Sequence, residues 1–219
     1  MKITFNKNTR NIEAGVVIDF SVIDKLKSIT MVGDNGCGKS TLIQAIRGSF
    51  KPQTKSLFED DYKDLVKKGE IILEHNYENV FFMDGVLDNG THFMNAFDAC
   101  NLVDMGGFAK GRKSHGEGSL IDIHSFMEKN KSKIVKDKTL MVFDEIDNGL
   151  SLKNMSLFQN FVNRLINQYG CHVIISTHNP FLITQSIICF DMEDKTMKSS
   201  SRYVEEKTGY KIEKVNFSS

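Results

Sequence analysis

The sequence has no excess of either charge, because its 219 residues include 28 Lys and Arg against 28 Asp and Glu. A neutral chain has no global positive field that would attract nucleic acid, so any basic binding surface has to be local. No apolar run approaches the roughly 18 residues of a membrane helix, and the N-terminus has no hydrophobic signal-peptide region. We therefore expect a cytoplasmic protein without a membrane span.

Cysteine and proline are scarce too. The four cysteines, Cys37, Cys100, Cys171 and Cys189, include no Cys-x-x-Cys pair, which favours reduced thiols over a disulfide framework or a zinc site. There are two prolines, and no internal repeat or Pro-rich linker marks a domain boundary. The length suits one α/β domain with a sizeable core, so we predict a single domain over residues 1–219.

Residues 29–47 contain the clearest motif. An apolar, β-rich stretch runs into a glycine-rich turn and then into a segment with helical spacing. Gly33, Gly38, Lys39 and Ser40 complete the P-loop pattern in that turn. Glycines let consecutive N–H groups point inward, and the following helix directs its positive end at the same hollow. The motif therefore predicts a phosphate site; the alternative is a plain glycine-rich turn.

The P-loop pattern also predicts roles for its side chains. Lys39 is expected to reach the β- and γ-phosphates of a nucleotide as a point charge, and the Ser40 hydroxyl to bind Mg²⁺. The residues predicted to bind the nucleotide here are Asp34, Asn35, Gly36, Cys37, Gly38, Lys39, Ser40 and Thr41.

Two apolar strands predicted later in the chain end in polar residues. Residues 139–143 lead into Asp144 and Glu145 in the form of a Walker B motif, although two carboxylates can also begin a surface turn. Ligands lie at the carboxyl ends of buried parallel strands, so we expect Asp144 to hold Mg²⁺ and Glu145 to orient or deprotonate the attacking water. Residues 171–176 lead to His178, either a surface histidine or, as we favour, a γ-phosphate contact. Lys39, Glu145 and His178 are the candidate catalytic residues.

The remaining pattern supports an α/β fold. Helical spacing over residues 153–169, closed by Gly170, predicts a helix between the strands at 139–145 and 171–176, and hence a right-handed crossover in a parallel sheet. The apolar stripe of this helix is expected to be core packing, and it consists of Leu157, Phe158, Phe161, Val162, Leu165 and Ile166. On two N-terminal strands, at 2–5 and 14–22, Phe5 and Phe20 are either core residues, as we favour, or adenine contacts. Further predicted elements are strands at 71–74, 79–83 and 187–191, helices at 91–103 and 120–128, an amphipathic helix or surface segment at 49–68, and a hairpin or strand at 202–215.

Three more motifs accompany these. Residues 114–118, Ser-His-Gly-Glu-Gly, would alone be a polar loop, but they resemble the signature motif of the ATP-binding-cassette ATPases. Residues 146–151 resemble the D-loop of that superfamily, and residues 176–180 its switch histidine. With five motifs in order, the chain resembles the superfamily over nearly its whole length, in the branch of SMC, RecF and compact standalone ATPases of bacteria and phages.

The resemblance implies a P-loop NTPase fold with a mainly parallel sheet, an N-terminal antiparallel β portion, and a short helical insertion within residues 41–120 that carries the signature. It also implies an ATPase that uses ATP and Mg²⁺ and forms a head-to-tail homodimer around two ATP molecules. Ser114, Gly116, Glu117 and Asp147 would contact the nucleotide in that dimer. Contacts that exist only with ATP would make the protein a nucleotide-driven clamp or switch.

The sequence departs from the family in two places. No glutamine occurs between Gln53 and Gln159, where the family has a Q-loop glutamine that touches Mg²⁺. Asp84 is the candidate substitute, and we expect hydrolysis to be slow or partner-stimulated. The stretch between Lys39 and Ser114 is too short for a long coiled coil and has no heptad pattern, which argues against a true SMC protein.

Three classes of function remain. We prefer a clamp in a DNA-related, phage or antiphage process, with an unidentified protein partner. The alternatives are a nucleotide-binding subunit of a membrane transporter and an ATP-dependent scaffold with little turnover. Local support for nucleic-acid binding is a run of lysines, although such a run is usually a solvated face: Lys129, Lys131, Lys133, Lys136 and Lys138.

Overall fold

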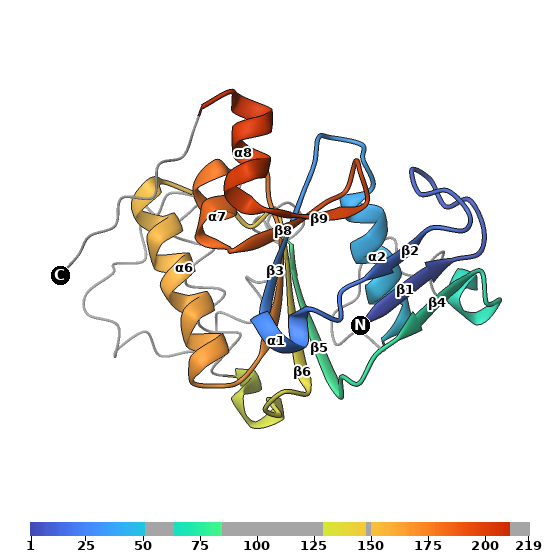
Figure 1. Cartoon of the computed structure of the whole chain (residues 1–219). Helices are drawn as coiled ribbons and strands as arrows, with labels where there is room; N and C mark the ends of the chain where they lie inside the picture. Colours follow the sequence, from blue (N-terminus) through green and yellow to red (C-terminus); the bar gives the residue numbers. More distant parts are fainter. Residues whose placement is uncertain (51–63, 85–128, 148–149, 211–219) are drawn as a thin grey trace, which may run out of the picture.

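The computed structural model describes residues 1–50, 64–84, 129–147 and 150–210 (Figure 1). Its elements follow one another as β1 (Lys2–Phe5), β2 (Val17–Asp19), α1 (Ile23–Leu26), β3 (Ser28–Val32), α2 (Lys39–Ser49), β4 (Ile71–Glu74), β5 (Asn79–Asp84), the 3-10 turn η2 (Lys131–Lys133), β6 (Thr139–Asp144), α6 (Leu152–Asn167), β7 (His172–Ser176), α7 (Pro180–Gln185), β8 (Ile188–Asp191), β9 (Thr196–Ser199) and α8 (Ser200–Thr208). None of these described helices is long and apolar enough to cross a membrane.

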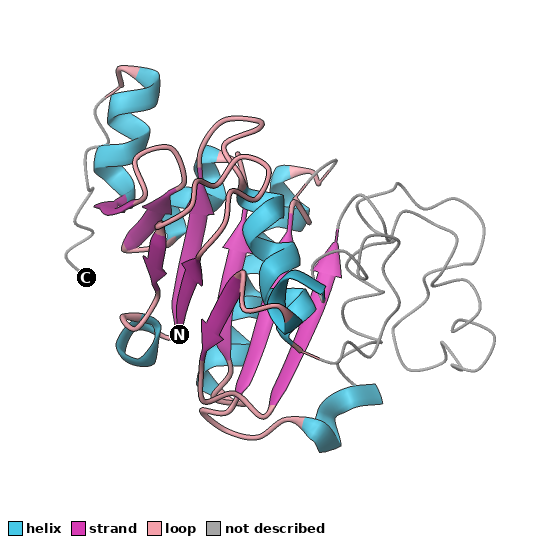
Figure 2. Cartoon of the chain, turned by 90° about the vertical axis from the view of Figure 1, so that its right-hand side faces the viewer, coloured by secondary structure: helices cyan, strands magenta, loops and turns pink. Residues whose placement is uncertain are grey.

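Two sheets organise the described residues. One has six strands in the order β5-β6-β7-β3-β8-β9, and its neighbours pair in parallel except for β8 and β9. The other is antiparallel, in the order β2-β1-β4. In Figure 1, α6 and α7 lie on one side of the six-stranded sheet, and α2 lies between that sheet and the antiparallel one. Figure 2 shows the strands side by side. The predicted α/β fold with an N-terminal antiparallel portion is confirmed.

The strand β6 shows how this layering follows from the sequence. All of its residues are buried, and successive side chains point to opposite faces. Val142 packs in the cluster that includes α2, whereas Phe143 packs in the cluster that includes α6. There the ring of Phe143 meets the ring of Phe158 edge on, with centroids 5.2 Å apart. A strand covered on both faces has to be apolar throughout, which is the pattern of residues 139–143.

The predicted core residues lie inside with one exception. Phe5 and Phe20 are fully buried, so the core interpretation is confirmed and neither ring is open to an adenine. On α6, Phe158 and Val162 face the sheet as predicted, but Leu157 is 49% exposed and does not belong to the core stripe. The apolar stripe of α6 is therefore narrower than its sequence indicates.

The hairpin or strand predicted from residue 202 is wrong over the described residues, which form α8. The Ser199 hydroxyl caps this helix by accepting a hydrogen bond from the N–H of Arg202 at 3.3 Å. Gly209, at φ 73°, ends it in the left-handed conformation. The Thr208-Gly209 pair is thus a helix C-cap rather than a hairpin turn, because glycine serves both purposes equally well.

Other predicted boundaries differ by a few residues. The strand expected at 14–22 is limited to β2. The last residue of α6 is Asn167, and Gly170, at φ 65°, donates its N–H to the carbonyl oxygen of Ile166 at 3.1 Å, as predicted for a C-cap glycine. The predicted helices at 91–103 and 120–128 lie outside the described residues, as does most of the insertion expected within residues 41–120.

Candidate nucleotide-binding site

The P-loop connects the carboxyl end of β3 to the first turn of α2. Gly33, Gly36 and Gly38 adopt φ values of 132°, 86° and 104°, which side chains other than glycine rarely tolerate. A Cβ atom added to Gly33 would also lie 2.7 Å from the Cys37 sulfur. The curled backbone therefore depends on these glycines.

Lys39 directs its charge into this loop. Its side chain is buried, and its ammonium donates hydrogen bonds to the carbonyl oxygens of Gly33 at 2.7 Å and Asp34 at 3.1 Å. The adjacent Ser40 is exposed in the first turn of α2, a turn without acidic residues. An ammonium and the positive end of an 11-residue helix therefore meet at one loop, which is a favourable environment for phosphate groups.

The N-terminal segment supports the loop from another side. The Asn11 side-chain amide donates a hydrogen bond to the carbonyl oxygen of Gly36. A Cβ atom on Gly38 would lie 3.1 Å from the Ile12 side chain, so Ile12 packs closely against the loop. Neither residue can be identified from the sequence, because neither belongs to a motif and both lie far from the loop along the chain.

The predicted Walker B residues follow the buried strand β6. Asp144 is its last residue and is buried, with its backbone in register with Ser176 of β7 and with Asp84 of β5. Ser176 is in turn in register with Met31 of β3, next to the P-loop. The carboxyl ends of these strands thus form one edge of the sheet. The predicted Q-loop substitute, Asp84, has its backbone on this edge.

Glu145 and His178 meet at that edge. Oε1 of Glu145 lies 3.4 Å from Nε2 of His178, and both side chains are partly open to solvent. Glu145 has a φ of 48°, in the left-handed region, and its N–H donates to the carbonyl oxygen of Ser176 at 3.0 Å. The backbone turn after β6 therefore carries the Glu145 side chain towards the loop that follows β7.

Asp147 contacts the residue next to His178. Its Oδ2 accepts a hydrogen bond from the Thr177 hydroxyl at 2.7 Å, and burial raises the pKa of its carboxyl group. The described part of the predicted D-loop is thereby hydrogen-bonded to the residue directly before His178. The signature residues predicted to act with it, Ser114, Gly116 and Glu117, lie outside the described residues.

The donor set fits Mg²⁺ bound with a nucleotide. Mg²⁺ in such sites takes one or two carboxylates or hydroxyls and completes its shell with phosphate oxygens and water. The buried Asp144 carboxylate and the exposed Ser40 hydroxyl are donors of this kind. Within the described ranges there is no cluster of three or more His, Cys, Asp or Glu that could hold a metal without a nucleotide. Phosphate oxygens and water would complete the shell.

Comparisons with known proteins point in the same direction. The family model described as "AAA domain, putative AbiEii toxin, Type IV TA system" matches residues 123–184. The zinc import ATP-binding protein ZnuC of Buchnera aphidicola is 22% identical over 74% of this chain and 68% of its own length. ABC transporter F family member 2 of Arabidopsis thaliana is 27% identical over 85% of this chain, which spans only 25% of that protein.

Solved structures share the fold. CbiO1 from Clostridium perfringens, part of the ABC transporter complex CbiONQ, has a TM-score of 0.54 at 16% identity and covers 94% of this chain and 91% of its own. A dimeric ATP-binding cassette in a post-hydrolysis state, bound to ADP and Pi, has a TM-score of 0.51 at 12% identity. The match covers 91% of this chain and 99% of that cassette. Together with the motifs and the sheet order, these comparisons show that the chain has the fold of ATP-binding-cassette ATPase domains and resembles their nucleotide-binding domains in sequence.

Proposed function

We propose that the chain binds ATP with Mg²⁺ and hydrolyses it at the edge formed by β3, β6 and β7. The observation that carries this proposal is the 3.4 Å approach of Glu145 and His178 on the edge where β3 leads into the P-loop. A P-loop with a buried lysine accounts for binding alone. A carboxylate and an imidazole at the same edge add groups that can orient water and accept its proton.

Each residue has one role in this proposal. Lys39 binds the β- and γ-phosphates, while Ser40 and Asp144 hold Mg²⁺, which offsets phosphate charge when bound. Glu145 accepts a proton from the water whose oxygen bonds to the γ-phosphorus, and the bond from that phosphorus to the oxygen bridging to the β-phosphate breaks. His178 holds the Glu145 carboxylate and contacts the γ-phosphate.

The working form is a head-to-tail homodimer around two ATP molecules. Ser114, Gly116 and Glu117 of one copy cover the ATP on the P-loop of the other, and Asp147 borders the interface. The dimeric ATP-binding cassette bound to ADP and Pi, which shares this fold, supports the arrangement. Since Asp147 is bonded to Thr177, a shift at the interface is transmitted to the loop of His178.

The test compares Glu145→Gln with the wild-type chain. Without the carboxylate, hydrolysis should fall by about 10²–10⁴-fold, the usual contribution of a general base. The ATP-bound dimer should then accumulate, so the mass in solution should double with Mg²⁺-ATP and return to that of a monomer when Ser114→Arg is added. Glu74→Gln, an exposed carboxylate at the end of β4, is the matched control and should hydrolyse ATP normally. A monomer with ATP demonstrably bound would rule out the shared site.

The process that the dimer serves is also a proposal. We favour a cytoplasmic clamp of the SMC/RecF-like branch in a DNA-related, phage or antiphage process. It is supported by three exposed lysines, Lys129 before η2 and Lys131 and Lys133 within it. A transporter subunit is the second candidate, because ZnuC is named as a zinc import protein and CbiO1 as part of a transporter complex. Salt-dependent DNA binding would support the first candidate, and co-purification with a membrane protein the second.

A further inference from the structure

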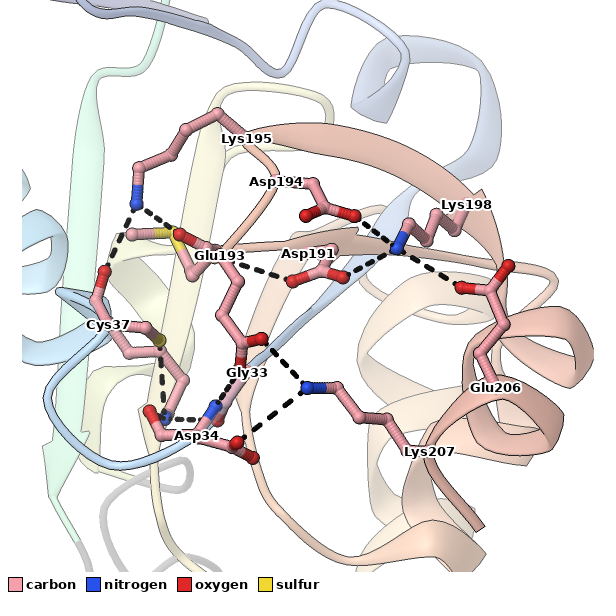
Figure 3. A network of polar contacts seen from close by, with 12 residues as sticks. Gly33, Asp34, Cys37, Asp191, Glu193, Asp194, Lys195, Lys198, Glu206 and Lys207 are labelled. Carbon is pink, nitrogen blue, oxygen red and sulfur yellow. Dashed lines mark hydrogen bonds and ion pairs between the residues drawn. The ribbon is translucent and has the colours of Figure 1, made fainter. Parts of the chain in front are cut away.

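The turn that joins β8 to β9 lies directly against the P-loop (Figure 3). Oε1 of Glu193 accepts a hydrogen bond from the N–H of Asp34 at 2.8 Å, across 159 positions of the chain. Before it, the N–H of Met192 donates to the carbonyl oxygen of Val32 at 2.9 Å. The phosphate loop is thus bonded to the turn at the point where it leaves β3.

A second contact is made two residues later in the same turn. The Lys195 ammonium donates to the carbonyl oxygen of Cys37 at 3.1 Å and to that of Met192. Cys37 lies in the middle of the P-loop, one residue before Gly38. The turn therefore holds the loop at both its beginning and its middle, and it does so with charged side chains.

Lys207 of α8 completes the group. Its ammonium donates to Oε2 of Glu193 at 2.8 Å and lies 3.7 Å from Oδ2 of Asp34 (Figure 3). The bond from Lys207 lowers the pKa of Glu193 and raises the pKa of Lys207. Both groups are therefore charged near neutral pH, and α8 is tied to the P-loop through one carboxylate.

The charges suggest what this arrangement does. Partly exposed ion pairs contribute little to folding stability, because solvent screens them and ordering two side chains costs entropy. A carboxylate beside a phosphate loop also repels a nucleotide unless a cation neutralises it. The Lys207 ammonium neutralises the Glu193 carboxylate. The same carboxylate fixes the backbone at Asp34 by accepting its N–H, and it does so before any ligand binds. Ordering a loop in advance removes part of the entropy cost of binding.

We propose that Glu193 and Lys207 are positioning residues for ATP, which hold the P-loop in its binding conformation and couple its affinity to the position of α8. This inference rests on the proposed function, since it concerns the affinity of the same site. A partner that displaces α8 would weaken nucleotide binding without touching the nucleotide. The two residues act through one contact, so their effects on affinity are not additive.

The test measures the Mg²⁺-ATP dissociation constant of the full chain by calorimetry. Glu193→Ala, which removes the acceptor of the Asp34 N–H, and Lys207→Met should each weaken binding by about ten-fold, the loss expected for one charge-assisted hydrogen bond. The double variant should bind Mg²⁺-ATP about as tightly as the single variant with the lower affinity. The matched control is Arg202→Met, which breaks the 2.7 Å pair of Arg202 with Glu206 on the same helix and should bind ATP normally.

The outcomes separate the two proposals. If the wild-type chain does not bind ATP, the proposed function fails, and this inference fails with it. If the wild-type chain binds ATP and the Glu193 and Lys207 variants bind it equally well, only this inference is overturned. The urea unfolding midpoints of all variants should equal that of the wild-type chain. If a variant that binds ATP more weakly also unfolds at a lower urea concentration, the residue has only a structural role, and this inference is overturned.

Discussion

The backbone at Glu145 allows a test that separates conformation from chemistry. Its φ of 48° is left-handed, a conformation that costs residues with a Cβ about 1–2 kcal/mol and costs glycine nothing. Compared with alanine, however, glycine increases the backbone entropy of the unfolded chain, which lowers the free energy of unfolding by about 0.4–1 kcal/mol. Glu145→Gly should therefore be more stable than Glu145→Ala by about 1 kcal/mol, the difference between these two effects.

The assay is urea unfolding of both variants, read as the free energy of unfolding. Both lack the carboxylate, so ATP hydrolysis should be lost equally in both and only stability should separate them. At Glu74, an exposed residue with ordinary strand backbone, the order should reverse, with glycine about 0.5–1 kcal/mol less stable than alanine. If the glycine and alanine variants rank in the same order of stability at both positions, the left-handed backbone at residue 145 is not strained by a Cβ atom, and the prediction is refuted.

Three further changes test other parts of the structure. Gly33→Ala places a Cβ atom 2.7 Å from the Cys37 sulfur at a φ of 132°, so ATP affinity measured by calorimetry should fall by at least about ten-fold. Burial and the nearby Lys27 ammonium lower the pKa of His172, so the folded state binds fewer protons than the unfolded state below pH 6.5. Stability should be full above that pH and decline below it by at most about 1.4 kcal/mol per pH unit, a slope that His172→Gln should flatten in urea titrations. Ser151→Ala removes the cap of α6 and should cost about 1 kcal/mol of unfolding free energy, whereas Ser156→Ala inside the same helix should cost almost nothing.

Much of the site could be predicted because its motifs are local. A strand, a glycine turn and a helix identify the P-loop within residues 29–47, and an apolar run before two carboxylates identifies Asp144 and Glu145. The approach of Glu145 to His178 follows from parallel strands that end at one edge. Helix α8 was missed because Gly209 ends a helix as readily as it makes a hairpin turn.

The contacts of Glu193 could not be predicted in the same way. A glutamate in a short turn between two strands is ordinary in sequence, and nothing near it indicates a partner at Asp34. The pairing arises only because β8 lies next to β3 in the sheet, with Val32 in register with Asp191. That register places the turn after β8 beside the loop after β3, so the support of the P-loop is a property of strand order rather than of any motif.

Strand order also places Asp84, the candidate substitute for the Q-loop glutamine that this sequence lacks. Because β5, β6, β7 and β3 are parallel and adjacent, the backbones of Asp84, Asp144, Ser176 and Met31 form one row across the sheet. The last residue of β5 is placed at this edge of the sheet whatever its type. An aspartate offers Mg²⁺ a charged oxygen where a glutamine offers a neutral one, so Asp84 stays the proposed substitute for the missing glutamine. Such a substitution would change the charge of the metal ligand without requiring any change in the fold.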